Sequence, residues 1–348
     1  MKICLSHMTA LRALQRWSCE SAVTLDEFHR LRPNSAAHLP TQMLPTSSSL
    51  RSAVASEADF LRVVADPEPD LWRDRLERYF TDLDNDDRLH LLVPLKPGVR
   101  STKHLVFHQA CLQLPPGSLV ALSPNVLVCS PELLFVQMAT QLEIGELIAL
   151  GYELCGCYPL SPASLKVRRQ LTTPQRLSSY IQHVPGMAGV RRARVAVRFV
   201  RAKSASVMET EVSALATTSL KWGGYGLPAA KLNEPLVLSP AAATIARSSH
   251  LVIDAFWPDK GIALEFDGRE GHSSELDRAR DSRRRDALTA EGIDFFTVTY
   301  RQLSSIMEFD EIVSQVARAL GKQLRKPPTF TAAHFRLRQQ LRNHHRFE

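Results

Sequence analysis

The sequence lacks several features that would point to a common protein class. It has no run of 18 or more apolar residues, which excludes an ordinary transmembrane helix. Six cysteines spread over 348 residues exclude a disulfide scaffold, and the spacing of Cys155 and Cys157 does not suit a zinc knuckle. Neither GxGxxG nor a GxxxxGK phosphate loop occurs, so we expect no nucleotide cofactor. Polar residues interrupt the apolar run near the start, so we expect no signal peptide and a cytoplasmic location.

The composition that remains is typical of a soluble globular protein. At about 100–200 residues per domain, 348 residues predict two or three domains. Hydrophobic residues make up 44% and charged residues 23% of the chain, which excludes a fully disordered chain, a collagen and a simple coiled coil.

Charge is distributed unevenly along the chain. Residues 57–88 hold eleven acids against five arginines, whereas residues 166–203 hold ten bases and no acid. The tail, 322–348, holds seven bases against one glutamate. Separate basic blocks suit a polyanion, because neutralising phosphates releases counterions. Solvated helix faces would explain one such block. With two blocks around one candidate catalytic region, nucleic-acid binding explains the basic residues equally well.

The local patterns divide the chain into four segments. We expect an N-terminal segment at 1–88, a mixed strand and helix domain at 89–203, a third domain at 204–321, and a basic tail at 322–348 with a helix at 331–342. The expected fold class is α/β, in an α+β multidomain arrangement.

Within the first two segments, short elements are predicted. The first contains a helix at 8–17, a Pro/Ser-rich stretch at 39–50 and an acidic helical stretch near 70–80, with no identifiable role. The second begins with short strands, continues as a helix from Ser130 and Pro131, and ends in two short helices separated by Pro185-Gly186.

The stretch from Leu251 to Gly268 carries the clearest chemistry. Two apolar runs flank a turn sequence, Pro258 to Gly261, which predicts a β-hairpin in which Asp254 faces Glu265. Side chains alternate along a strand. One face of the second strand should therefore enter a core (Ile262, Leu264, Phe266), and the other should point away (Ala263, Glu265, Asp267).

Asp254, Glu265 and Asp267 are thus expected on one face of the hairpin. Directly opposed like charges destabilise a sheet, and neighbouring carboxylates resist ionising together. A divalent cation removes this repulsion, and Mg²⁺ favours carboxylates together with waters and phosphates. We favour a metal or proton-relay site over the alternative, a solvated acidic face balanced by Lys260 and Arg269.

Neighbouring segments add another acid and complete an element order. Ser206 opens an amphipathic helix that carries Glu209 near its start, just upstream of the hairpin. A charged helix through Arg284 follows the hairpin, then a strand at 295–300 and a closing helix at 309–320. The predicted order is helix, strand, strand, helix, strand, helix.

These residues carry a resemblance to a known family. The chain resembles proteins related to very-short-patch-repair endonucleases, which have the PD-(D/E)xK restriction-endonuclease-like fold, and the match spans about 204–321. The matching residues are Met208-Glu209-Thr210, Asp254, Glu265-Phe266-Asp267-Gly268, His272, Asp281, Arg284 and Leu288. The resemblance implies an αββαβα core, preceded by the smaller mixed α/β domain.

The same resemblance implies metal-dependent hydrolysis of phosphodiester bonds in DNA, by an endonuclease or a nickase. Asp254 and Glu265 would bind Mg²⁺ or Mn²⁺, and Glu209 and Asp267 would support the metal directly or through water. Asp267 stands where the usual pattern has a lysine. Because an aspartate cannot stabilise developing negative charge, another residue substitutes for that lysine, or catalysis is weak or absent.

Several basic residues complete the implied site. His272 would donate or accept a proton, and Arg284 would neutralise the phosphate or hold Asp281. His272, Arg269 and Arg284 are the candidates to replace the missing lysine. The arginines expected to contact nucleic acid are Arg191, Arg192, Arg194, Arg269, Arg283 and Arg285.

Residues 89–203 carry a second resemblance, to the domain found in AbiEi-type antitoxins and related transcriptional regulators. Its cues are the helix start CSPELL at 129–134 and the stretch PGMAGVRRAR at 185–194. This resemblance implies an alternative function, a non-catalytic DNA-binding regulator that retains a degenerate nuclease fold.

Three function classes therefore stay open. Four clustered acids favour the nuclease, because a protein that only binds a polyanion gains little from them. The missing lysine and the AbiEi-like domain favour the regulator. In a third interpretation, the acidic 57–88 segment covers the basic surface of a partner-binding protein. The expected partners are DNA, a second copy of the chain or a toxin protein, and no membrane.

Overall fold

The computed structural model describes residues 3–20, 39–40, 44, 46, 48, 50, 88–95, 98–102, 105–110, 113–122, 126–157, 168–268 and 275–344. The acidic stretch near 70–80, Arg269 and His272 lie outside the described residues. The chain is a mixed α/β protein, as predicted. It divides into two compact units, one formed by Met1–Leu142 with Pro162–Arg194 and the other by Glu143–Ser161 with Val195–Glu348.

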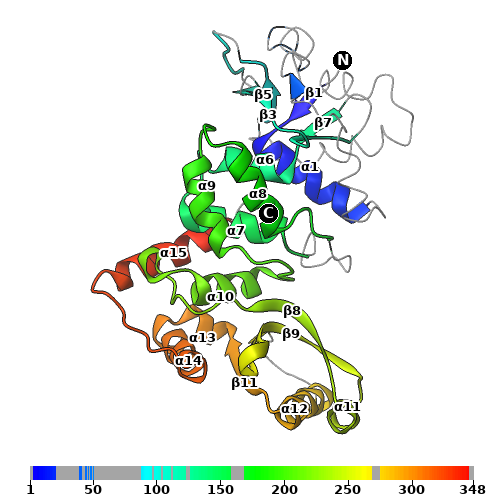
Figure 1. Ribbon diagram of the computed structural model, residues 1–348, viewed down its shortest axis with the longest axis vertical. Helices are drawn as coiled ribbons and strands as arrows, with labels where there is room; N and C mark the ends of the chain where they lie inside the picture. The colour runs from blue at the N-terminus through cyan, green and yellow to red at the C-terminus, as the bar shows by residue number, and fades with distance from the viewer. Residues whose placement is uncertain are drawn as a thin grey trace. The chain divides into compact units, whose positions relative to one another are not determined.

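The described part of the first unit contains a five-stranded sheet, drawn above α6 in Figure 1. In sheet order, its strands are β4 (Leu105–Gln109), β3 (Leu89–Val93), β1 (Ile3–Leu5), β7 (Val126–Cys129) and β6 (Leu119–Ala121). The pairs β3–β4 and β1–β7 are parallel, and β1–β3 and β6–β7 are antiparallel. A separate short pair joins β2 (Leu39–Pro40) to β5 (Gln113–Leu114). The strands predicted after residue 88 are present, and the central β1 is an addition from the first segment.

The first unit also holds α1 (His7–Glu20), α6 (Pro131–Met138), α8 (Pro174–His183) and most of α9 (Val190–Ala196). The predicted start of α6 is confirmed, since the Ser130 hydroxyl accepts a hydrogen bond from the amide of Leu133 and Pro131 opens the helix. α8 and α9 lie on either side of Pro185-Gly186, as predicted.

The single helix predicted from residue 131 is wrong, because the chain forms two. α6 ends at Met138, and α7 (Ile144–Leu154) begins after Glu143, which forms a capping box with Glu146. Two reciprocal cap hydrogen bonds begin a new helix at this point. The sequence is apolar on both sides of it, so the hydrophobic pattern does not show the break. α7 belongs to the second unit.

The second unit contains a four-stranded sheet in the order β11-β10-β9-β8, with β10 and β11 parallel and the other pairs antiparallel. The strands are β8 (Lys231–Val237), β9 (His250–Trp257), β10 (Ile262–Asp267) and β11 (Asp294–Thr299). The predicted order omitted β8 and the following α11 (Pro240–Ala246). β8 contains Pro235 and occupies an edge of the sheet, where a missing N–H is tolerated, so its sequence gives a weak strand signal.

The predicted hairpin is confirmed, with its register. Ile262 pairs with Trp257, and Leu264 pairs with Ala255. The turn is a short 3-10 helix, η4 (Pro258–Lys260), closed by Gly261 at a φ of 62°. Glycine reaches this left-handed conformation without the steric cost of a Cβ atom, which explains the tight reversal.

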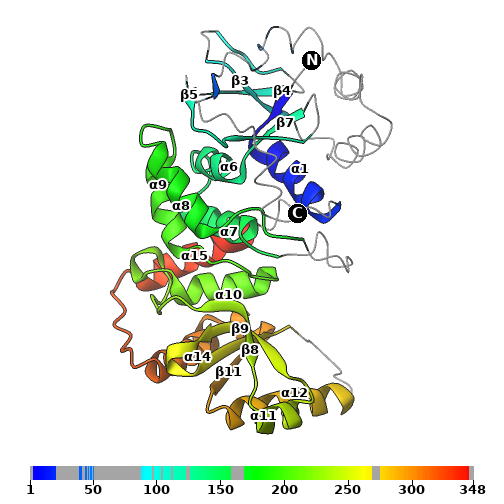
Figure 2. The ribbon, with the colours of Figure 1, turned by 45° about the vertical axis from the view of Figure 1, so that its right-hand side comes forward.

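The other described helices of the second unit are α10 (Val207–Thr217), α12 (Glu275–Ala290), α13 (Tyr300–Ser304), α14 (Ile306–Ala319) and α15 (Phe330–His344), with short turns η2 (Val197–Phe199) and η3 (Leu220–Trp222). Figure 2 shows α10, α12 and α14 beside the sheet, and α15 beyond α10. α12 packs on one side, where Leu288 joins a core with Ile253, Phe256 and Ala263, and α14 packs against β10 and β11.

The expectation that Ala263 points away from a core is therefore wrong. Ala263 is fully buried beneath α12, so both faces of β10 are covered near its start. The pattern changes along the strand, since Ile262, Ala263 and Leu264 are buried whereas Glu265 and Asp267 are partly exposed. Glu265 and Asp267 thus lie on the less buried half of β10.

Candidate active site

Asp254 lies on β9 at the point where the hairpin ladder ends. The last ladder pair is Leu264 with Ala255, and beyond it the Oδ2 atom of Asp254 accepts a hydrogen bond of 2.9 Å from the amide of Phe266. A side-chain oxygen thus takes the place of a backbone partner for this amide. The half-buried carboxylate is held against the backbone of β10, one residue from Glu265.

The pKa of Asp254 is raised from its ordinary value of 3.8 to about 7. Burial is the largest cause, followed by the negative charge of Glu209, and the charge of Glu265 adds to the effect. The hydrogen bond from Phe266 and the charge of Arg284 act in the opposite direction. Glu209 of α10 and Glu265 of β10 are therefore close enough to Asp254 to raise its pKa.

This raised pKa predicts a pH-dependent stability. The folded protein binds the Asp254 proton more tightly than the unfolded chain, so stability falls as pH rises from about 4 to about 7. Asp254→Asn keeps an oxygen acceptor for Phe266 and removes the charge. In EDTA at pH 8 we expect the variant to be more stable than the wild type by about 2 kcal/mol, a value reduced for partial exposure, and at pH 4 we expect no difference.

Urea unfolding at the two pH values measures this effect. Asp259→Asn is the matched control, because Asp259 is exposed in the turn of the same hairpin. An equal gain for Asp254→Asn at pH 4 and pH 8 would contradict the charge explanation.

Glu265 is paired with Arg284 of α12. The Nε atom of Arg284 lies 3.1 Å and 3.0 Å from the two carboxylate oxygens of Glu265, and its Nη2 atom donates to Glu265 and to the carbonyl of Val252. The Glu265 side chain is 14% exposed and that of Arg284 25%. Arg284 thus neutralises one acid and ties α12 to β9 and β10. The partner predicted for Arg284 was Asp281 or a phosphate.

Glu209 is held at the start of α10. Its Oε1 atom accepts from the hydroxyl of Ser206, and its Oε2 atom accepts from the amide of Ala205 at 2.9 Å and from the side-chain amide of Asn233 at 2.7 Å. Ser206 in turn accepts from the amide of Glu209. These bonds give Glu209 a structural role at the helix cap, in addition to its charge near Asp254.

Asn233 also belongs to the site, although the sequence did not predict it. It lies on β8 with a φ of 47°, a left-handed conformation that asparagine tolerates better than most residues. Its side-chain amide joins Glu209 to the carbonyl of Lys203. An asparagine two residues before Pro235 is the signal that was available, but nothing in the sequence links it to Glu209.

The remaining predicted acids are Asp267 and Asp281. Asp267 ends β10 and is half-buried, and Asp267 and Asp281 both interact with other groups. Among the residues that the structure describes, the four carboxylates of Glu209, Asp254, Glu265 and Asp267 do not form a group of three whose oxygens all lie within 4.8 Å of one another.

The basic residues divide into exposed and internal ones. Arg191 and Arg194 of α9 and Arg285 of α12 are exposed, and Arg283 is half-buried. Arg192 is used internally, since it donates to the carbonyls of Ala139 and Leu142 after α6. Of the six arginines predicted to contact nucleic acid, Arg192 instead caps the end of α6. Arg269 lies outside the described residues.

The basic tail is also used internally. Lys326 pairs with Asp310, and Arg338 and Arg342 both pair with Glu211 of α10, whose side chain is 1% exposed. Lys322 donates to the carbonyl of Gly226. α15 packs against α7 and α10, so these charges hold the second unit together. Arg325 and Arg336 are exposed.

Comparison of the chain with protein-family models, with curated proteins and with solved structures found no match. Among the described helices, none combines the length and the apolar character needed to cross a membrane.

Proposed function

We propose that the second unit is a metal-dependent nuclease that hydrolyses phosphodiester bonds in DNA. The observation that carries the proposal is Asp254, held at the end of a hairpin ladder, with its pKa raised to about 7 by burial and by Glu209 and Glu265. A fold gains no stability from such repulsion. Acids retained at this cost are typical of a functional site.

The fold supports the same proposal. We propose that 204–321 forms a restriction-endonuclease-like core, in which α10, β9, β10, α12, β11 and α14 follow one another in the order that the family resemblance implies. β8 and α11 are additions to this order at one edge of the sheet. The candidate residues lie on α10, β9, β10 and α12. The family resemblance implies site residues on the same elements.

The donor set suits Mg²⁺ or Mn²⁺. All candidate ligands are carboxylate oxygens, and a dication would relieve the repulsion that raises the pKa of Asp254. Asp254 and Glu265 would hold the metal, with Glu209 and Asp267 in support. When bound, such a metal supplies a polarised phosphate and a more acidic water.

The residues of the chain itself would divide the remaining tasks. Asp254 accepts a hydrogen bond from the amide of Phe266, which orients its carboxylate toward the site where the metal would bind. Arg284 orients Glu265 through its Nε and Nη2 atoms. Exposed arginines of α12 such as Arg285 would contact the DNA backbone, because they lie on the helix that carries Arg284.

One observation favours a second function, a non-catalytic DNA-binding regulator of the AbiEi type. Glu265 is fully engaged by Arg284, and both oxygens of Glu209 are engaged at the α10 cap. Two of the acids are therefore satisfied without a metal. Asp267 in place of a lysine points in the same direction.

Cleavage of supercoiled plasmid separates the two functions. We expect nicked or linear DNA with Mg²⁺ or Mn²⁺ and none with EDTA, and a Glu265→Ala preparation controls for contaminating nucleases. No cleavage together with a plasmid gel shift would replace the nuclease by the regulator. Neither cleavage nor shift would overturn both functions and favour the partner-binding interpretation.

A further inference from the structure

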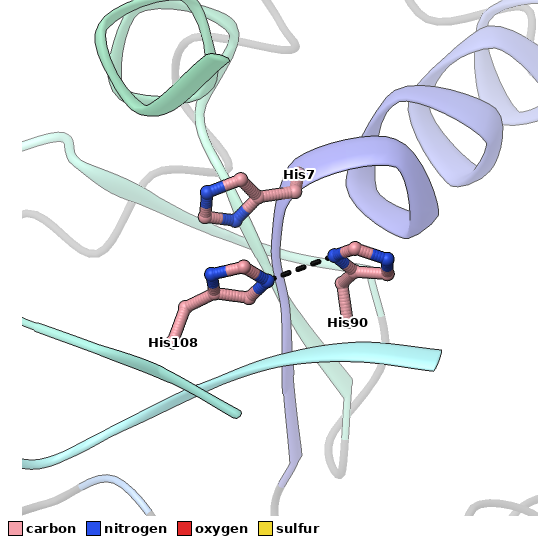
Figure 3. Close-up of side chains that lie close together, drawn as sticks. All are labelled: His7, His90 and His108. Atoms are coloured by element: carbon pink, nitrogen blue, oxygen red, sulfur yellow. Dashed lines mark hydrogen bonds between the residues drawn. The ribbon is translucent and has the colours of Figure 1, made fainter. Parts of the chain in front are cut away.

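Three histidines meet in the first unit, away from the acids in sequence and in a different compact unit. His7 begins α1, His90 lies on β3 and His108 lies on β4 (Figure 3). One ring nitrogen from each histidine lies within 4.8 Å of the others. His90 Nδ1 and His108 Nε2 are 2.8 Å apart, and the rings of His7 and His108 stack with centroids 3.4 Å apart.

The sheet itself brings these side chains together. β3 and β4 are parallel, with His90 opposite Val106 and Leu92 opposite His108, so the two histidines lie on the same face, offset by two residues. Two residues that flank His7 in the sequence, Ser6 and Thr9, form hydrogen bonds with the backbone of His90. Its carbonyl accepts from the amide of Ser6 at 2.9 Å, and its amide donates to the hydroxyl of Thr9 at 2.9 Å.

His7 shows two features that side-chain packing leaves unexplained. It is 5% exposed, and its Nδ1 atom is buried without a hydrogen-bond partner in the described part of the chain. A buried polar atom without a partner costs about 1–3 kcal/mol. The φ of His7 is 48°, a left-handed conformation that is unfavourable for a residue with a Cβ atom. Figure 3 shows the His7 ring lying over His108, with His90 beside them.

We propose that His7, His90 and His108 bind a transition-metal dication, Zn²⁺ foremost, with a fourth position open to water or to an anionic ligand. Three imidazole nitrogens with one open position match the donor set of a zinc centre that keeps a site for a ligand. Imidazole also suits other borderline dications such as Co²⁺ and Ni²⁺ but is a poor ligand for Mg²⁺. His90 and His108 are half-buried, which leaves the cluster accessible from one side.

Burial supports the ligand role by keeping the rings neutral. It lowers the pKa of His7 to about 2 and that of His108 to about 4, and the neighbouring histidines add to both effects. Ring nitrogens of neutral histidines have the lone pair that a metal requires. Zinc–nitrogen bonds of about 2.0–2.1 Å place tetrahedral ligand atoms about 3.3 Å apart. Binding therefore separates His90 from His108 slightly and turns His7 out of its stack.

The test is a titration of the full-length protein, stripped with EDTA and dialysed, with Zn²⁺ followed by calorimetry. We expect one ion per chain with a dissociation constant of about 1 μM or tighter. His90→Ala and His108→Ala should each weaken binding at least about thirtyfold. His183→Ala is the matched control, because His183 is exposed at the end of α8 in the same unit. Unchanged binding in both cluster variants, or no binding to the wild type, would overturn the proposal.

Two further measurements distinguish loss of the metal site from misfolding of a variant. Zn²⁺ should raise the Tm of the wild type but not that of His90→Ala. Co²⁺ in the wild type should show visible bands of a tetrahedral nitrogen site without the intense near-ultraviolet band of a thiolate ligand. A thiolate band would assign the metal to cysteines such as Cys4 or Cys129 instead. Zn²⁺ affinity that falls in Asp254→Ala would place the ion at the carboxylates and also overturn the proposal.

Discussion

Asp254→Asn is expected to lower metal-dependent nicking of plasmid DNA by about a hundredfold or more. The substitution keeps an oxygen that accepts the Phe266 amide, so the hairpin should stay in place. It removes the negative charge that would hold the cation, and loss of one group that stabilises the transition state commonly costs about two orders of magnitude or more. Initial nicking rates at limiting Mg²⁺ measure the effect.

Three comparisons make this loss specific. Asp259→Asn removes an acid from the exposed turn between the same strands and should leave the rate unchanged. Glu265→Gln should lose activity as Asp254→Asn does. Gel shifts in EDTA should be unchanged or slightly tighter for both site variants, because each removes negative charge from a surface that meets phosphates. Wild-type nicking rates in Asp254→Asn and Glu265→Gln would show that these acids are not the catalytic ones.

Unfolding cannot explain the expected loss, because the same variant should gain stability at pH 8. Burial and two neighbouring acids disfavour the Asp254 carboxylate in the metal-free protein. The asparagine removes that penalty while it removes activity. Opposite directions for stability and activity at one residue are typical of a functional site.

Arg338→Met is expected to destabilise the second unit by about 3 kcal/mol or more. Glu211 is 1% exposed and Arg338 is 5% exposed at the side chain, and their charged atoms lie 3.9 Å apart. Burial raises the pKa of Glu211 and lowers that of Arg338, so each depends on the charge of the other. Removing one partner of a buried pair leaves an uncompensated charge, which costs about 3–5 kcal/mol. Arg338 also donates to His334 and lies over the Phe309 ring.

Arg342→Met provides the control for this prediction. Arg342 lies 3.0 Å from the same Glu211 but its side chain is 49% exposed, so water replaces much of the lost interaction and we expect a loss of about 1 kcal/mol or less. Urea unfolding of both variants at neutral pH measures the difference. Adding Glu211→Gln to Arg338→Met should restore part of the stability. Equal effects of the two arginine variants would mean that burial of the pair does not matter.

The hairpin shows what short-range sequence information is able to determine. The apolar runs, the turn from Pro258 to Gly261 and the alternation of side chains predicted its strands and register, and the ladder agrees. Both helices around Pro185-Gly186 and the start of α6 at Ser130 were likewise predictable. In each case, the deciding interaction lies within a few residues of the chain.

The partners of the candidate acids depend on contacts between distant residues. Arg284 reaches Glu265 across 19 positions, and Asn233 reaches Glu209 across 24. The basic tail also depends on distant contacts. Its many charged residues suggest an exposed helix, but Arg338 is 4% exposed and pairs with Glu211. The sequence shows that such a charge is present, but it does not show which opposite charge pairs with it.

The sequence by itself determined the mixed α/β class, the hairpin and the choice of Asp254 and Glu265 as neighbours, because local periodicity and turn chemistry specify these features. Only the tertiary structure decided that Arg284 neutralises Glu265 and that His7, His90 and His108 meet. Sheet pairing places these histidines together although they are far apart along the chain. The pairing of β1 with β3 depends on burial of the whole sheet, which no short stretch of sequence encodes.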